Sequence, residues 1–147
     1  MIEYDIARSD ENNSTSFSRD NIADFLYSHL DQYGDEREAI INCIGYAYGD
    51  EAGQDGFILV GHEEGKIVGI VIINHTNMSG YIPEHILVYI AVNSSYRGKG
   101  VGSALMEHII QETEGDIALH VEPENPATFL YEKYGFINKY LEMRLSK

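Results

Sequence analysis

The stretch from Arg97 to Ser103 combines the residue types that bind phosphate. A run rich in β-branched residues, Val88 to Val92, precedes it, and an amphipathic helical pattern begins at Val101. This order predicts a strand, a glycine turn and a helix N-terminus, where unpaired N–H groups and the helix dipole favour an anion. The glycines let a ligand approach the main chain closely, and two cations add positive charge. We therefore expect a phosphorylated cofactor to contact Arg97, Gly98, Lys99, Gly100, Val101, Gly102 and Ser103.

The spacing of the glycines distinguishes between the known phosphate-binding turns. The dinucleotide fingerprint G-x-G-x-x-G needs a glycine where this chain has Ser103, and it belongs to an N-terminal βαβ unit. No segment matches the nucleotide triphosphatase loop G-x-x-x-x-G-K-[ST]. The pattern Arg97-x-x-Gly100-x-Gly102 closely resembles the pyrophosphate-binding turn of the GNAT superfamily of acyl-CoA-dependent N-acyltransferases. A dinucleotide-dependent oxidoreductase is the weaker alternative.

A second segment, His120 to Ile137, resembles a later motif of the same superfamily, in which a strand leads to a short helix and then to Gly-Phe. Asn125 is a favoured N-cap, Pro126 suits the first helical position, and Gly135 is a natural helix terminator. The resemblance implies that Asn125 contacts the cofactor. Asn125 stands one residue closer to Tyr131 than in many members of the superfamily.

The resemblance covers essentially the whole chain and implies a fold and a reaction. The fold is α/β, with a GNAT-like mixed central sheet in the order β-α-α-β-β-β-α-β-α-β. The reaction is acetyl transfer from acetyl-CoA to a primary amine by direct attack in a ternary complex. The amine could be a small cationic amine, a peptide N-terminus or a lysine, and a homodimer is compatible with the fold. The alternative is a catalytically silent module that binds acyl-CoA as a sensor.

Three chemical tasks remain in such a reaction, and the resemblance assigns two of them. Tyr131 would donate a proton to the departing thiolate, a role that a silent binder would not need. The main chain of Ile90, Ala91 and Val92, near the end of the predicted fourth strand, would bind the pantetheine arm and the oxyanion. The third task is to deprotonate the amine. Glu84, just before that strand, and His120, in the predicted fifth strand, are the candidate bases.

Composition sets further limits. The 147 residues, 44% of them apolar, suit a single N-acetyltransferase domain over residues 1–147. Cys43 lies on an apolar helical stripe and indicates packing, not nucleophilic chemistry. The acidic first residues lack the pattern of a signal peptide, and no apolar stretch is long enough to span a bilayer, so we expect a cytoplasmic protein without membrane contact. The histidines have no metal-ligand spacing, and no metal is expected.

The net charge of −14 excludes the basic face that a nucleic acid would need and favours a cationic acceptor. Acids gather near the expected junction of the first two helices, and they are Asp31, Asp35, Glu36 and Glu38. These acids would repel the cofactor phosphates only weakly, because exposed charges beyond about 8 Å are largely screened at physiological salt.

The elements that must position these residues follow from periodicity and from turn residues. Apolar spacing predicts helices through residues 22–30 and 40–48, ending near Gly34 and Gly49. Strands are expected at 3–7, at 57–62 and 66–75 as a hairpin, and at 85–92. A helix to about Glu114, a strand at 117–121, the short helix after Asn125 and a last strand at 136–145 complete the chain.

Overall fold

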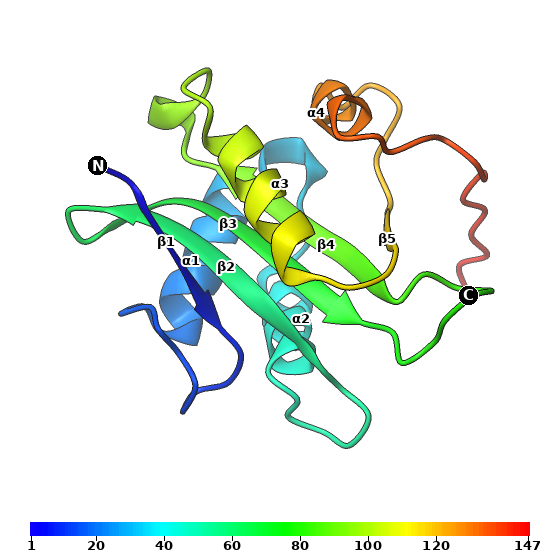
Figure 1. The fold of residues 1–147 in the computed structure, drawn as a ribbon, viewed down its shortest axis with the longest axis horizontal. Coiled ribbons are helices and arrows are strands. Elements are labelled where there is room, and N and C mark those ends of the chain that lie inside the picture. The colour runs from blue at the N-terminus through cyan, green and yellow to red at the C-terminus, as the bar shows by residue number, and fades with distance from the viewer.

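The computed structural model describes all residues, 1–147, and is built on a five-stranded mixed sheet in the order β1-β2-β3-β4-β5 (Figure 1). The strands are β1 (Glu3–Ala7), β2 (Gly56–Glu63), β3 (Lys66–His75), β4 (His85–Val92) and β5 (Ile117–Leu119). The first four pair antiparallel, and β5 runs parallel to β4. The expected α/β fold class is confirmed.

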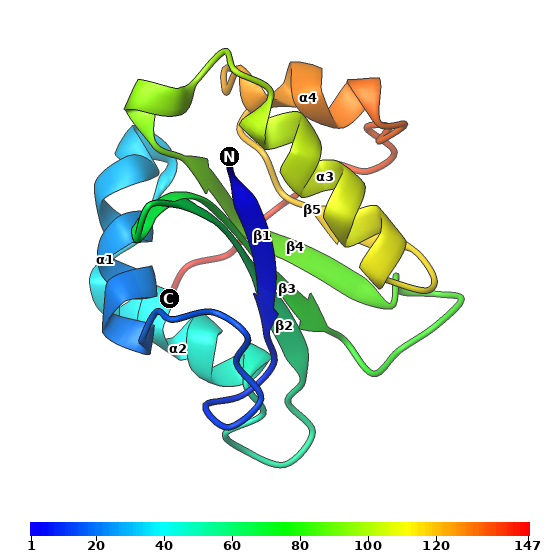
Figure 2. The same cartoon turned by 60° about the vertical axis from the view of Figure 1, so that its left-hand side comes forward.

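Helices cover both faces of this sheet, as Figure 2 shows. The helices α1 (Arg19–His29) and α2 (Arg37–Ala47) lie on one face, and α3 (Val101–Glu112) lies on the other, followed by α4 (Ala127–Lys133). Short 3₁₀ turns, Asp31–Tyr33 and Ser94–Tyr96, follow α1 and β4. None of the helices is both long enough and apolar enough to cross a membrane.

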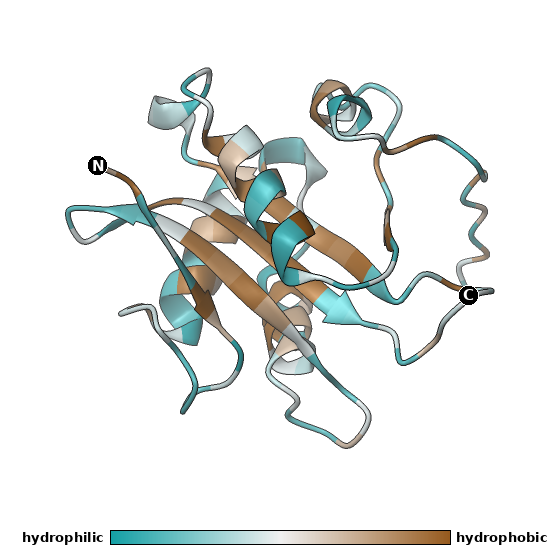
Figure 3. Ribbon diagram, viewed as in Figure 1, coloured by the Kyte–Doolittle hydropathy of each residue, from teal (hydrophilic) through white to brown (hydrophobic).

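The two helical layers bury two separate apolar clusters, one on each face of β2 and β3. Ile58 and Ile72 belong to the cluster under α1 and α2, whereas Leu59 and Ile73 belong to the cluster under α3. Because side chains alternate across a strand, a strand buried on both faces is apolar along its whole length. This accounts for the brown middle of β2 and β3 in Figure 3, whose ends are pale or teal.

The strands β4 and β5 part soon after they meet. They pair only from His85 to Leu87 on β4, opposite the whole of β5. On its other edge β4 follows β3 with one shift of register, in which Leu87 and Tyr89 face consecutive residues of β3 and Val88 is the extra residue of a bulge. From Val88 to Val92 the edge of β4 that faces β5 therefore has no strand partner.

Most expected elements are confirmed, with different ends. The helix expected to run toward Gly34 ends at His29 and gives way to a 3₁₀ turn, and the strand expected at 117–121 stops at Leu119. Gly49 has a φ of 70° just beyond α2, as a terminating glycine should.

The prediction of a last strand at 136–145 is wrong, because the chain forms no helix or strand after α4. Its alternating apolar residues are exposed: Leu141, Met143 and Leu145 each expose more than 80% of their surface. Alternation marks a strand only where a partner edge exists to pair with. The three-residue β5 offers too short an edge for a segment of this length.

Candidate active site

The glycine turn forms as expected between β4 and α3. Gly98 and Gly100 have φ values of 76° and 82°, in the left-handed region that side chains with a Cβ disfavour. Gly100 is the N-cap of α3. A Cβ built on either glycine would meet nothing within 4 Å, so the space beside the turn is open to a ligand.

The turn leaves a continuous series of backbone donors unused. No N–H group from Arg97 to Ser103 donates a hydrogen bond within the protein, and the ladder of α3 starts only with Ala104, which bonds the carbonyl of Gly100 at 3.0 Å. Unpaired donors at a helix N-terminus, reinforced by the helix dipole, are suited to phosphate oxygens. The turn therefore presents a cluster of backbone donors suited to a phosphate group.

The side chain of Arg97 does not point toward these donors. Its guanidinium donates to the carbonyls of Val92 at 3.3 Å and His29 at 3.1 Å, and to the carboxylate of Asp31 at 3.1 Å. Arg97 therefore ties the turn to the end of α1, and the charge that the sequence assigned to the phosphate is committed elsewhere. Lys99 lies over the ring of Tyr96, 5.3 Å from its centroid.

The open edge of β4 leads from the turn toward the bulge. The N–H of Asn93 donates to Val68 of β3, so alternation along the strand turns the N–H of Ala91 toward β3 as well. The N–H groups of Ile90 and Val92 then face the side that β5 has left. Of the predicted main-chain contacts, Ile90 and Val92 thus have donors on the open edge, and Ala91 does not.

Tyr131 is buried where α4 packs on α3. It belongs to the apolar cluster of Val101 and Leu105, and the end of α4 holds it in place. The N–H of Phe136 donates to the carbonyl of Tyr131 at 3.1 Å and that of Gly135 to Glu132 at 3.0 Å, which is a Schellman motif. Burial raises the pKa of Tyr131 to about 12. Its hydroxyl has no hydrogen-bond partner and is not among the fully buried unpaired atoms, so it is free to meet a ligand.

The N-cap of α4 is Pro126. Asn125, the expected N-cap, lies one residue earlier and contacts the first turn of the helix. Its Oδ1 accepts the N–H of Ala127 at 2.9 Å, and its carbonyl accepts the hydroxyl of Thr128 at 3.0 Å. Only the Nδ2 donor of Asn125 remains for a contact with a cofactor.

The two predicted bases lie in different surroundings. The Glu84 carboxylate accepts the N–H of Asp116 at 3.2 Å, and this hydrogen bond is the main reason that its pKa lies below the ordinary value. Glu84 precedes β4, at the end of that strand opposite the glycine turn. His120 follows β5 instead of lying in it, is exposed, and makes no hydrogen bond within the chain. The Glu84 carboxylate is therefore occupied by a hydrogen bond to the main chain, whereas the His120 ring is free to contact a substrate.

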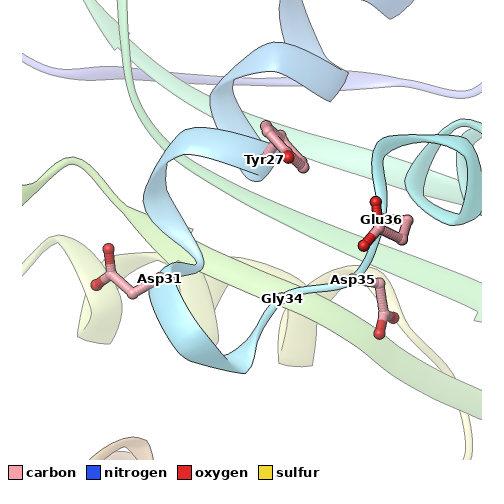
Figure 4. A pocket seen from close by; sticks show the side chains of 5 residues that line it. All are labelled: Tyr27, Asp31, Gly34, Asp35 and Glu36. Carbon is pink, nitrogen blue, oxygen red and sulfur yellow. The ribbon is translucent and has the colours of Figure 1, made fainter.

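An acidic hollow of about 500 Å³ lies at the junction of α1 and α2 (Figure 4). Its lining consists of Tyr27, Asp31, Gly34, Asp35 and Glu36. The Tyr89 hydroxyl donates to Asp35 at 2.5 Å, which connects the hollow with β4 next to the bulge. Burial, and then this hydrogen bond, raises the pKa of Tyr89. The acidic cluster read from the sequence therefore surrounds a real hollow, without Glu38.

Comparison with known proteins identifies the family. Residues 54–138, more than half of the chain, match the family model of the acetyltransferase (GNAT) domain. The chain belongs to the GNAT family of acetyltransferases. The matched range includes the glycine turn, the open edge of β4 and Tyr131.

Other proteins resemble this GNAT chain in part or in fold. A mouse protein, cysteine-rich protein 2-binding protein, is 37% identical over 54 residues, which are 36% of this chain and 7% of the mouse protein. The chain therefore spans a small part of the length of that relative. A possible acetyltransferase from Clostridium difficile 630 superposes with a TM-score of 0.68 at 22% identity, covering 99% of this chain and 97% of the other. A predicted acetyltransferase from Clostridium acetobutylicum, solved with acetyl-CoA, gives 0.70 at 15% identity, covering 98% and 96%.

One residue beside the turn of this GNAT chain escaped the sequence interpretation. The ammonium group of Lys133, at the end of α4, donates to the hydroxyl of Ser103 at 3.2 Å, and the Tyr134 hydroxyl donates to the carbonyl of Ser103 at 3.2 Å. The only sequence signal for Lys133 is its place in Leu-Tyr-Glu-Lys-x-Gly-Phe, two residues after Tyr131. Nothing in that spacing shows that it reaches α3. The structure gathers no group of three or more metal-ligating side chains.

Proposed function

We propose that residues 1–147 act as one N-acetyltransferase domain that moves an acetyl group from acetyl-CoA to a primary amine in a ternary complex. Membership of the GNAT family supports acetyl transfer in general. The observation that carries the specific proposal is the row of free N–H groups from 97 to 103 that continues into the open edge of β4. A phosphate-rich carrier with an extended, amide-containing arm fits such a path.

Two parts of the main chain would bind different parts of the cofactor. The N–H groups of the glycine turn would hold the pyrophosphate, while those of Ile90 and Val92 would pair with the pantetheine arm or the acyl oxygen. Acetyl-CoA, when bound, supplies a thioester whose carbonyl carbon accepts the amine. Arg97 keeps the turn in place through its three bonds to the protein.

Tyr131 would stabilise the leaving sulfur. Because burial holds its pKa at about 12, the phenol carries its proton at neutral pH and can donate it. A free thiol has a pKa of about 8.5, so complete proton transfer from Tyr131 to a thiolate costs on the order of 4–5 kcal/mol. A strong hydrogen bond from the phenol, with the proton finally taken from water, is therefore the more favourable route.

The acceptor would enter from the other face of the sheet. The hollow around Asp35 and Glu36 would attract an ammonium group, and Tyr89 links that hollow to the middle of β4. Only about one alkyl ammonium in a thousand is a free amine at pH 7, so a base must take a proton. His120, which has no partner in the protein, is our candidate for that role. Glu84 is the less favoured alternative, and a His120→Gln variant with wild-type turnover would eliminate His120.

The test is a screen of amine acceptors with acetyl-CoA that follows thiol release. Polyamines, aminoglycosides, peptides with free N-termini and lysine peptides cover the acceptor classes. We expect release that depends on one of these classes and saturates with it. A protein that binds acetyl-CoA but releases no thiol with any acceptor would fit the silent sensor instead.

A further inference from the structure

The positive charges of this acidic protein fall into two groups. Every arginine has a carboxylate within 4.0 Å: Arg8 pairs with Glu112, Arg19 with Asp10 and Asp50, Arg37 with Asp20 and Asp24, Arg97 with Asp31, and Arg144 with Glu142. None of the lysines has one at that distance. The cations that remain to meet an external anion are therefore lysines.

Three of these lysines gather around the glycine turn. Lys99 belongs to it, and both Lys99 and Lys66 lie over the ring of Tyr96, at 5.3 and 6.0 Å from the centroid. The Tyr96 hydroxyl donates to Glu63 at 3.1 Å, and Glu63 is also the strand partner of Lys66 across the hairpin of β2 and β3. Lys133 approaches from α4 instead. Its ammonium group donates to the uncharged hydroxyl of Ser103 and lies over the ring of Tyr134, 5.5 Å from the centroid.

The end of α4 fixes Lys133 beside the free donors of α3. Gly102 leaves room for Leu130, whose Cδ2 lies 3.2 Å from the position that a Cβ on Gly102 would take. The Tyr134 hydroxyl bonds the carbonyl of Ser103, and the Schellman motif ends the helix directly after these residues. An ammonium group has three donors, of which Ser103 uses one. Two donors of Lys133 are thus free at the first turn of α3.

We propose that Lys133 is a cofactor-binding residue that contacts the pyrophosphate of CoA, an assignment that rests on the proposed function. Its ammonium supplies from α4 the positive charge that Arg97 does not supply from the turn. The pyrophosphate is the group concerned, because Ser103 belongs to the row of unpaired N–H groups where that group would sit. A contact between Lys133 and the phosphate would also hold α4 in position, and with it Tyr131, two residues earlier in the same helix.

The test is calorimetric titration with CoA and with dephospho-CoA, which lacks the 3′-phosphate. Lys133→Ala should weaken both by about ten-fold or more, because the phosphate would lose a charge-assisted hydrogen bond. Lys133→Arg should recover most of the affinity. The matched control is Lys139→Ala, because Lys139 also lies over the ring of the tyrosine that follows it, at 5.4 Å, but sits in the tail. That control should change neither affinity.

Four results would overturn the assignment. If Lys133→Ala caused no further loss of affinity in a Ser103→Ala background, Lys133 would act only through Ser103 and would not touch the phosphate. If Lys133→Ala weakened CoA but not dephospho-CoA, the residue would bind the 3′-phosphate and not the pyrophosphate. Wild-type protein that bound neither compound would overturn the proposed function and this inference together. Wild-type affinity in Lys133→Ala would overturn this inference alone. Thermal unfolding of each variant shows whether the fold is intact.

Discussion

Arg97 forms an ion pair with Asp31, which lies 66 positions earlier in the chain, with its Nη2 atom 3.1 Å from the Asp31 carboxylate. This contact joins the glycine turn after β4 to the 3₁₀ turn that follows α1, and Asp31 also lines the acidic hollow. The proposed cofactor site and the proposed acceptor site are thus connected through one ion pair. Desolvation, and then the nearby Arg97 charge, lowers the pKa of His29 in the same region.

The first prediction distinguishes the ion pair between Arg97 and Asp31 from the role of Arg97 in anchoring the glycine turn. Arg97→Ala should weaken acetyl-CoA binding about ten-fold, because the turn loses its bonds to Val92 and His29 as well as to Asp31. Asp31→Asn should change affinity and stability little, since both partners are about half exposed and such pairs contribute roughly 0–1 kcal/mol. Asparagine also tolerates the φ of 55° at this position. Equal losses of affinity in the two variants, measured by calorimetry, would contradict the anchoring role.

The second prediction concerns Gly100. Gly100→Val should abolish acetyl-CoA binding, because a branched side chain would occupy the open space beside the donors and would disfavour the left-handed φ of 82°. Gly53→Val is the matched control. Gly53 has a φ of 85° and equally open surroundings, but it lies in the loop before β2. Both variants should lose similar stability in thermal unfolding, and only Gly100→Val should lose affinity. Unchanged affinity in that variant would place the cofactor elsewhere.

The third prediction concerns Tyr131 and pH. Tyr131→Phe should keep affinity for acetyl-CoA within a few-fold and lower turnover by roughly 10²-fold, the usual effect of removing one hydrogen-bond donor from a developing negative charge. Tyr48→Phe is the control, because burial also raises the pKa of Tyr48 to about 12, although it lies in the other apolar cluster. Turnover of Tyr48→Phe should match the wild type. Wild-type turnover in Tyr131→Phe at neutral pH would leave Tyr131 with a packing role only.

The same pKa gives this prediction a second readout in stability. The folded protein keeps the Tyr131 proton up to a pKa of about 12, whereas the unfolded chain releases it near the ordinary value of 10.0. The folded state therefore binds more protons in that window, and the free energy of unfolding should fall as pH rises from 10 to 12. Below pH 10 this contribution should be fully present. In Tyr131→Phe the decline measured by denaturant titration should be shallower.

The sequence alone predicts those features that depend on residues only a few positions apart. The glycine turn, the end of α4 and the burial of Cys43 were predictable, because each depends on spacing within a few residues. Burial raises the pKa of Cys43 to about 12, which agrees with packing and not with reactivity. Local periodicity also placed the hairpin of β2 and β3, whose strands are apolar on both faces.

The misjudged residues depend on contacts between distant segments. The side chain of Arg97 is directed by Asp31, and Lys133 by Ser103, in each case across at least 30 positions. No spacing rule in one sequence relates those positions. The expected last strand failed for a similar reason, since its alternation is real but β5 is too short to pair with it. Residues whose partners lie far along the chain are the ones that a single sequence leaves undetermined.

The fourth prediction concerns the choice of acceptor. If the hollow attracts a cationic amine, kcat/KM should fall as salt rises from about 0.02 to 0.2 M, because surface fields are screened over that range. Asp35→Asn should lower kcat/KM for cationic amines and flatten this salt dependence. Asp116→Asn is the control, because Asp116 is also exposed and its carboxylate is unpaired, but it lies outside the hollow. A flat salt dependence, or preference for an acidic acceptor, would reduce the acidity to a role in solubility.

We propose that this chain transfers acetyl groups from acetyl-CoA to amines, and the transferred group can be followed directly. The most direct measurement incubates the protein with isotopically labelled acetyl-CoA and its best acceptor amine, and then quantifies labelled acceptor by mass spectrometry against thiol released. We predict one labelled acetyl group on the amine nitrogen for each thiol released, with both products strongly reduced in Tyr131→Phe. Thiol release without labelled acceptor, or tight acetyl-CoA binding with no labelled product for any amine, would contradict the account.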